Sequence, residues 1–318
     1  MSAEIGIGAI HCVLPEVLVP VADLPEFGML GAEEAAFATS CGIDTVGEFA
    51  DLTHADLAAR ACLGLGASAD VLLLVGPRSP DVLLGSDVSR VQHEAKLDGA
   101  FAFTVDGLGC TGSSAAWGLA KELLIADPGR ESVVVAFGSR PTGVDRIRPP
   151  VSVIGDGGYA MSLVRGGRPV LRAHRVESDG RFHDLFAVDY KQAPWYEWRE
   201  VCADPDRYKF ELAMESRGRL NRMVDEVLTE VGASRADVAA TIMQNVTANA
   251  FKFYSTLLGL PIHPVCERHL VDYGHIGAMD VVLNFQALLA TGDVGRGDLV
   301  VVINNSPTAA WSATLWEV

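Results

Sequence analysis

The chain has 318 residues, of which 41 are acidic and 25 basic, and its net charge of −16 excludes a protein that neutralises nucleic-acid phosphates. The hydrophobic share of 49% supplies a buried core, which excludes a disordered chain. Residues 1–100 hold 15 acids and 4 bases, whereas residues 140–222 hold 12 acids and 15 bases. An anionic ligand is therefore expected to meet the middle of the chain.

The sequence predicts neither a membrane span nor an export signal. Its most apolar runs, such as residues 71–75 and 299–303, are far shorter than the roughly 20 residues that cross a bilayer. No basic region precedes an apolar stretch at the N-terminus. The six cysteines form no Cys-x-x-Cys pair, which is typical of free thiols in a reducing compartment, so we expect a cytoplasmic protein.

Short apolar runs alternate with segments of helical periodicity, a pattern typical of a layered α/β fold. In chain order the predicted strands are residues 71–75, 101–105, 133–137, 159–164, 240–243, 299–303 and 311–316, the first three of them fully buried. The predicted helices are residues 111–126, 217–231, 249–258 and 281–290. The order of elements is similar on both sides of a break near residues 165–169, which predicts two halves, 1–166 and 167–318. Residues 184–206, rich in Trp, Tyr, Pro and charge, are expected to form an inserted cap.

Cys110 lies where a predicted strand gives way to a helix. Gly107 and Gly109 permit a tight turn after residues 101–105, and Cys110 falls in the first turn of the helix that follows. The helix dipole and the unpaired N–H groups of that turn favour a thiolate. The position therefore suggests a nucleophile, and a small buried core cysteine is the alternative on position alone.

Motifs along the whole chain resemble one family. They are Asp-Gly-Leu-Gly-Cys-Thr-Gly-Ser at 106–113, Val-Val-Val-Ala-Phe-Gly-Ser at 133–139, Gly-Asp-Gly-Gly-Tyr-Ala-Met at 155–161, Tyr-Gly-His-Ile-Gly-Ala-Met-Asp at 273–280 and Trp-Ser-Ala-Thr-Leu at 311–315. Together they resemble the β-ketoacyl-acyl-carrier-protein synthase III branch of the thiolase superfamily. The resemblance implies a thiolase-like, five-layered αβαβα fold built from two similar halves, a homodimer, and a Cys110 that accepts an acyl group from a thioester.

Two positions depart from the Cys, His and Asn that condensing enzymes of this branch use. Where the branch has its His, this chain has Gln244, which cannot carry a proton, and where it has its Asn, this chain has His275. The Gly-His-x-Gly-x-x-Asp pattern of 274–280 is similar to members that act as plain acyltransferases in secondary metabolism, such as polyketide and antibiotic biosynthesis. His275 can deprotonate an incoming hydroxyl, amine or thiol, and Asp280 can orient the imidazole. A packed histidine and an ordinary helix N-cap are the alternatives for these two residues.

Other residues are candidates for holding the acyl group. Asn245, which we place with the catalytic set, and Gln244 can polarise the acyl carbonyl or position the acceptor, unless they only satisfy local backbone groups. The resemblance implies an oxyanion hole with a donor in the loop before the last strand. Pro307 in that loop has no N–H, so this donor is expected at Thr308 or not at all.

The sequence therefore predicts a ping-pong acyltransferase. Cys110 takes an acyl group from an acyl-carrier-protein or coenzyme A thioester and passes it to a small-molecule hydroxyl or amine, or to a carrier thiol. Arg148 and Arg219 are candidates for binding the phosphates of these donors, unless they belong to a solvated face. The thioester is a substrate, and neither a cofactor nor a metal is expected. A decarboxylative condensing 3-oxoacyl synthase and a degenerate partner subunit of such a synthase remain as alternatives.

Overall fold

The computed structural model describes residues 4–77, 82, 85–141, 145–188, 191–192 and 194–318. The strands of its main sheet are β1 (Ile5–Val13), β4 (Val71–Val75), β5 (Phe101–Val105), β6 (Ser132–Ser139), β9 (Gly157–Arg165), β10 (Val170–Ser178), β13 (Val238–Met243), β14 (Leu299–Ser306) and β15 (Ala310–Glu317). Its helices are α1 (Ala32–Ser40), α2 (His54–Leu65), α3 (Asp87–Glu94), α4 (Gly112–Ala126), α5 (Pro205–Arg207), α6 (Ala213–Glu230), α7 (Ala248–Leu258), α8 (Pro264–Tyr273) and α9 (Asp280–Thr291). Every strand and helix predicted from the sequence overlaps one of these elements.

The main sheet repeats one strand pattern twice. Its order is β13-β14-β15-β10-β1-β9-β6-β4-β5. In the first half β4 runs parallel to β6, while β9 lies antiparallel between β6 and β1. In the second half β13 runs parallel to β14, while β15 lies antiparallel between β14 and β10. The two halves meet at β1 and β10, where Gly6 pairs with Val170.

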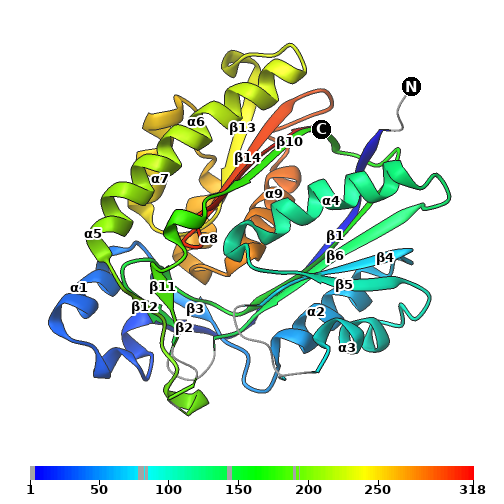
Figure 1. Cartoon of the computed structure of the whole chain (residues 1–318). Helices are drawn as coiled ribbons and strands as arrows, with labels where there is room; N and C mark the ends of the chain where they lie inside the picture. The colour runs from blue at the N-terminus through cyan, green and yellow to red at the C-terminus, as the bar shows by residue number, and fades with distance from the viewer. Residues whose placement is uncertain (1–3, 78–81, 83–84, 142–144, 189–190, 193) are drawn as a thin grey trace.

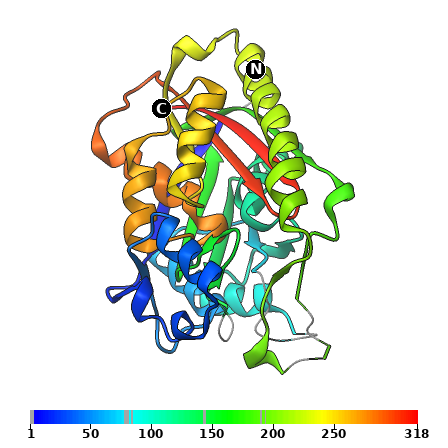
Figure 2. The same ribbon diagram turned by 90° about the vertical axis from the view of Figure 1, so that its left-hand side faces the viewer.

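Helices separate and flank the two halves of the sheet (Figure 1). Helix α4 packs against β4, β6 and β9 of the first half and against β10 and β15 of the second, so it lies between them. Helix α9 shares this central layer and packs against β1 and β13. Outside, α2 covers β1, β6 and β9, and α6 covers β10, β14 and β15 (Figure 2). The result is the thiolase-like αβαβα arrangement that the sequence predicts.

The central layer is held by large buried rings. The rings of Trp117 on α4 and Trp316 on β15 have centroids 5.6 Å apart, and Phe285 of α9 lies 5.5 Å from Trp316. All three side chains are fully buried, and burial of aromatic rings dominates core stability. The short 3-10 helices that precede α4 and α9, Gly109–Thr111 and Gly277–Met279, contact one another. A rigid core therefore fixes the N-terminal ends of the two central helices side by side.

One strand differs from its prediction. The sequence predicts that residues 101–105 form a fully buried strand, but β5 is the edge of the sheet and Phe101 is 65% exposed. The prediction of burial is wrong because an apolar run indicates a strand but does not indicate whether a further strand covers it.

In the described residues, three short strand pairs lie outside the main sheet. They are β2 (Leu18–Pro20) with β3 (Thr45–Gly47), β7 (Ile147–Arg148) with β8 (Ser152–Val153), and β11 (Phe186–Ala187) with β12 (Val201–Cys202). The last pair lies in residues 184–206, where the sequence predicts a cap. In the part of the chain that the structure describes, no helix is long and apolar enough to span a membrane.

Candidate active site

Cys110 is placed by a glycine turn between β5 and α4. Gly107 and Gly109 have φ angles of 80° and 52°, a region that favours glycine. The 3-10 helix Gly109–Thr111 leads directly into α4, so Cys110 lies at the N-terminal end of the central helix. This is the strand-to-helix corner that the sequence predicts.

His275 and Asp280 reach Cys110 from the second half of the chain. The Sγ atom of Cys110 lies 3.0 Å from Nε2 of His275, and Nδ1 of His275 lies 2.5 Å from Oδ2 of Asp280. The backbone of His275 is fixed on both sides, because its N–H donates to Val153 and its carbonyl accepts from Gly155. His275 is 3% exposed and Asp280 is fully buried. Nucleophile, imidazole and carboxylate thus form one hydrogen-bonded line.

Asp280 is surrounded by hydrogen-bond donors. Besides the imidazole, the N–H of Asn245 donates to Oδ2 and the N–H of Ile276 donates to Oδ1, each at 2.8 Å. Asp280 is the first residue of α9, and Met279 is the N-cap, so the N-cap alternative for Asp280 is wrong. Its carboxylate points back to the His275 loop, where bonds to both oxygens fix its orientation.

The environment of His275 favours its charged form. Burial by itself lowers the pKa of His275, but the charges of Cys110 and Asp280 and the hydrogen bonds to both outweigh burial and raise this pKa to about 10. The imidazolium therefore persists at neutral pH. An imidazolium beside the sulfur supports a thiolate, which is the form of cysteine that attacks a thioester.

Asn245 does not reach the reacting atoms. Its fully buried side chain accepts a hydrogen bond from Nδ2 of Asn284 at 2.8 Å, behind Asp280. Asn284 also donates to the carbonyl of Met243 and pairs with His269. Asn245 is therefore a positioning residue that acts through its backbone N–H on Asp280. The expected contact of its side chain with the acyl carbonyl is corrected, because Asn245 lines neither of the two cavities that contain Cys110.

Two cavities meet at Cys110. The first, which we name the α7 cavity, has a volume of about 380 Å³ and a wall that includes Tyr208, Lys209, Gln244, Asn249, Phe253 and Tyr254. The second, which we name the β6 cavity, has a volume of about 280 Å³ and a wall that includes Phe137, Ser139, Arg140, Arg148, Ile154 and Ala278. The residues that line both are Cys110, Val151, His275, Ser306 and Pro307. An acyl group on Cys110 can therefore lie on one side of the sulfur while another substrate arrives from the other side.

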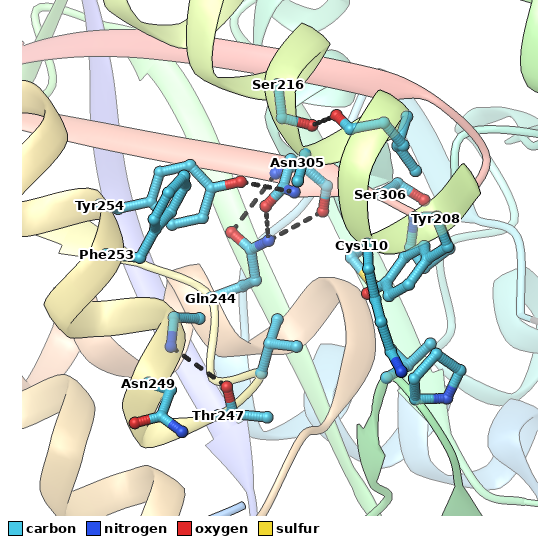
Figure 3. A pocket seen from close by; sticks show the side chains of 18 of the residues that line it. Cys110, Tyr208, Ser216, Gln244, Thr247, Asn249, Phe253, Tyr254, Asn305 and Ser306 are labelled. Atoms are coloured by element: carbon cyan, nitrogen blue, oxygen red, sulfur yellow. Dashed lines mark hydrogen bonds between the residues drawn. The ribbon is translucent and has the colours of Figure 1, made fainter. Parts of the chain in front are cut away.

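Gln244 lines the α7 cavity, but its amide is bound to Asn305 (Figure 3). Its Nε2 donates to the carbonyl of Asn305 at 2.9 Å and also to the side-chain oxygen of Asn305, while Oε1 accepts from the N–H of Asn305 at 3.3 Å. Asn305 in turn donates to the hydroxyl of Tyr254 at 3.2 Å. Both N–H groups of Gln244 are occupied, so its expected role in polarising the acyl carbonyl is corrected to support of the cavity wall.

The two predicted arginines lie in different places. Arg148 lines the β6 cavity, where it is buried and pairs with Asp145 at 2.8 Å. Arg219 lies outside both cavities, where its guanidinium stacks 4.7 Å from the ring of Trp311. Its ion pairs are with Glu177, Asp179 and Glu215. The prediction that Arg219 binds a donor phosphate is therefore wrong, because its guanidinium is already paired with three carboxylates and stacked on a ring.

The end of β14 holds two residues at the site that were not predicted from the sequence. Asn304 donates from Nδ2 to the carbonyl of Cys110 at 2.7 Å, and Ser306 lies at the junction of the two cavities. Thr308 lines the β6 cavity as expected, but its N–H donates to Oγ of Ser306 at 3.2 Å. The sequence prediction used only backbone donors near Pro307. The run of polar side chains at Asn304-Asn-Ser306 is the signal that could have indicated side-chain donors there.

No cluster of three or more His, Cys, Asp or Glu side chains within the described residues could hold a metal ion.

Known proteins resemble this chain in sequence and in fold. Residues 228–318, which include His275 and Asp280, match the family model described as 3-oxoacyl-[acyl-carrier-protein (ACP)] synthase III C terminal. The beta-ketoacyl-[acyl-carrier-protein] synthase III of Alkalilimnicola ehrlichii is 24% identical over 278 residues, which cover 83% of this chain and 84% of that protein. The chain is therefore similar to synthase III proteins over most of its length. The corresponding synthase of Thiobacillus denitrificans is 25% identical over 275 residues, or 85% of this chain and 84% of the relative.

Solved structures establish the fold of this chain. The 3-oxoacyl-(acyl carrier protein) synthase III of Pseudomonas aeruginosa PAO1 superimposes with a TM-score of 0.80 at 20% identity, covering 99% of this chain and 98% of that chain. ChlB3, which is named as an acyltransferase, also has a TM-score of 0.80, at 22% identity and with the same coverage. One fold thus carries both names, so the choice between condensation and transfer rests on the residues at the site.

Proposed function

We propose that this synthase III-like protein is an acyltransferase that works through a thioester on Cys110. The observation that carries the proposal is the line from Cys110 through His275 to Asp280, with 3.0 Å between sulfur and imidazole and 2.5 Å between imidazole and carboxylate. A nucleophile, a base in contact with it and an anion that orients the base are the parts that acyl transfer requires.

The reaction has two halves. In the first, Sγ of Cys110 attacks the thioester carbon, the bond from that carbon to the donor sulfur breaks, and His275 gives its proton to the departing thiolate. In the second, neutral His275 takes the proton of the acceptor hydroxyl or amine, whose oxygen or nitrogen attacks the acyl carbon. Cys110 leaves as a thiolate beside a restored imidazolium, and Asp280 stabilises the charge on His275 each time it forms.

The polar groups around Cys110 favour transfer over condensation. A decarboxylative condensation needs two neutral donors on the enolate oxygen that forms. At the positions where condensing members of the family carry His and Asn, this chain has Gln244, whose N–H groups are both bound to Asn305, and a charged His275. A base that accepts a proton from an acceptor suits the second half of a transfer reaction.

The cavities and the edge of the sheet suggest which molecules this protein binds. The α7 cavity is walled by amides, hydroxyls and rings, and apart from the imidazolium of His275 its one charged residue among the described lining groups is Lys209, which suits the uncharged arm of a phosphopantetheine thioester of coenzyme A or a carrier protein. The pattern of residues 274–280 is similar to that of acyltransferases in secondary metabolism, so the acceptor that we propose is a small molecule of secondary metabolism. The exposed edge strand β5 is the surface through which two copies of the chain would form a homodimer.

Intact-protein mass spectrometry with a panel of acyl thioesters tests the proposal. A donor should add its acyl mass to the wild-type chain and none to Cys110→Ala, and a nucleophilic acceptor should then remove the added mass. His275→Asn should become acylated more slowly, because it lacks the proton for the departing thiolate, and the adduct that forms should persist in the presence of the acceptor. If no donor adds mass, or if the adduct survives in Cys110→Ala, the proposed function is wrong.

Condensation is the second candidate, because the curated relatives are named as synthases. The same experiment with a malonyl thioester separates the two functions. Release of carbon dioxide and a product longer by two carbons would support condensation and contradict simple transfer.

A further inference from the structure

Acyl transfer on Cys110 needs a donor for the oxygen that becomes negative in the tetrahedral intermediate. In the loop that faces Cys110, Pro307 has no N–H, and the N–H of Thr308 is bound to Oγ of Ser306. The loop therefore offers neither of these backbone groups to a substrate. The side-chain hydroxyl of Ser306, the residue before Pro307, lies at the junction of the two cavities.

Ser306 is close to the nucleophile. It is one of the few residues that line both cavities, and it is 2% exposed. A Cβ atom added to Gly109 would lie 2.3 Å from Oγ of Ser306, so the hydroxyl occupies the space beside the residue that precedes Cys110. Figure 3 shows Ser306 next to Cys110 at one end of the α7 cavity. The absence of a side chain at 109 is what allows the hydroxyl to lie against the backbone of Gly109, the residue before Cys110.

The hydrogen bonds of Ser306 leave its proton available. A hydroxyl oxygen has two acceptor positions and one proton. The N–H of Thr308 donates to Oγ of Ser306 at 3.2 Å, and the hydroxyl of Thr308 lies 2.9 Å from the same atom. When both groups of Thr308 donate, they fill the acceptor positions, and the Ser306 proton is free to bind a ligand oxygen at the junction.

We infer that the Ser306 hydroxyl is an oxyanion donor of this site, an inference that rests on the proposed function. As Sγ of Cys110 bonds to the thioester carbon, the π electrons of the carbonyl move to its oxygen, and Ser306 donates its proton in a hydrogen bond to that oxygen without transferring it. When the carbonyl re-forms, the donor thiolate leaves with the proton of His275, and the Ser306 hydroxyl is unchanged. Thr308 acts as a positioning residue that directs the Ser306 proton.

The test compares acylation with alkylation of the same sulfur. Acylation by an acetyl or longer acyl thioester of N-acetylcysteamine forms an oxyanion, whereas alkylation by iodoacetamide forms none, and both are followed by intact mass. Ser306→Ala keeps every backbone N–H and should lower the acylation rate about 10²- to 10³-fold, with the alkylation rate within about twofold of wild type. Thr308→Val should give a smaller loss of acylation in the same pattern.

Two further variants separate a catalytic loss from a structural one. Ser306→Gly, which also lacks the hydroxyl, should match Ser306→Ala. Ser255→Ala removes a hydroxyl that likewise accepts a backbone N–H, that of Ile262, but lies outside both cavities, and it should leave both rates unchanged. Wild-type acylation rates in the two Ser306 variants, or equal losses of acylation and alkylation, would overturn the inference. Failure of every thioester to acylate the wild-type chain would instead overturn the proposed function, and the inference with it.

Discussion

Replacement of Asp280 by Asn tests the role of the carboxylate charge at the site while keeping the shape of the side chain. The carboxylate accepts from Nδ1 of His275 and the N–H of Asn245 on Oδ2, and from the N–H of Ile276 on Oδ1. An Asn side chain can place its oxygen at Oδ2 and keep two of these bonds. Its NH2 group then faces the N–H of Ile276, so one bond is lost and the negative charge disappears.

The size of the effect follows from the charge that the acceptor of the imidazolium bond loses. A hydrogen bond to a charged group contributes about 1.5–3 kcal/mol, and a neutral acceptor roughly halves that contribution. Because about 1.4 kcal/mol corresponds to a tenfold change in rate, Asp280→Asn should lower the rate of Cys110 acylation at pH 7 about 3- to 12-fold. Because Asp280 is one of the groups that raise the pKa of His275, this pKa should fall in the variant, and the imidazolium should be lost at a lower pH.

The assay is alkylation of Cys110 by iodoacetamide between pH 5 and 10, followed by intact mass. In the wild type the imidazolium beside Sγ should persist over most of this range, because the pKa of His275 is raised to about 10. In Asp280→Asn the imidazolium should be lost at a lower pH, so the alkylation rate should be lower than that of the wild type at pH 7–9. Asp237→Asn, at a surface carboxylate that accepts the N–H of Ser234, is the control. Identical pH profiles for wild type and Asp280→Asn in a folded variant would refute the proposed role of the carboxylate.

Three further predictions concern stability and assembly. Burial, followed by the charges of Lys121 and Arg175, lowers the pKa of His174 to about 4, so the unfolded chain binds a proton that the fold does not bind as the pH falls from about 6.5 to 4. The free energy of unfolding should fall by at most about 3 kcal/mol across that window, and His174→Gln should reduce the difference between urea titrations at pH 7 and pH 5. Phe101→Asp should convert a dimer to a monomer in sedimentation experiments, and a wild-type chain that sediments as a monomer would contradict the role of β5. Gly109→Ala should lower the free energy of unfolding by about 1–3 kcal/mol, because φ is 52° and the new methyl group meets Ser306; unchanged denaturation would show that the turn is not strained.

Local sequence patterns suffice to predict the secondary-structure elements and the nucleophile. The strands β4 and β5 have the bounds that their apolar runs predict, because glycines and polar residues end each run. The turn at Gly107 and Gly109 identifies the corner before α4, because only glycine adopts its left-handed backbone at low cost. These are short-range properties, and a linear pattern carries them completely. The motifs around Cys110 and His275 also led to the thiolase-like fold through their resemblance to a known family.

Which side chains meet, and which way they point, depends on tertiary packing. The 165 positions between Cys110 and His275 are bridged only because α4 and α9 pack in one layer, with their N-terminal ends in contact. The same packing turns the side chain of Asn245 behind Asp280, places Arg219 over Trp311, and brings the Ser306 hydroxyl beside Gly109. A pattern of residue types records whether a position prefers burial, but not which neighbour will bury it. For that reason the nucleophile was visible in the sequence, whereas the groups that orient it and receive the charge of the intermediate emerged only from the folded chain.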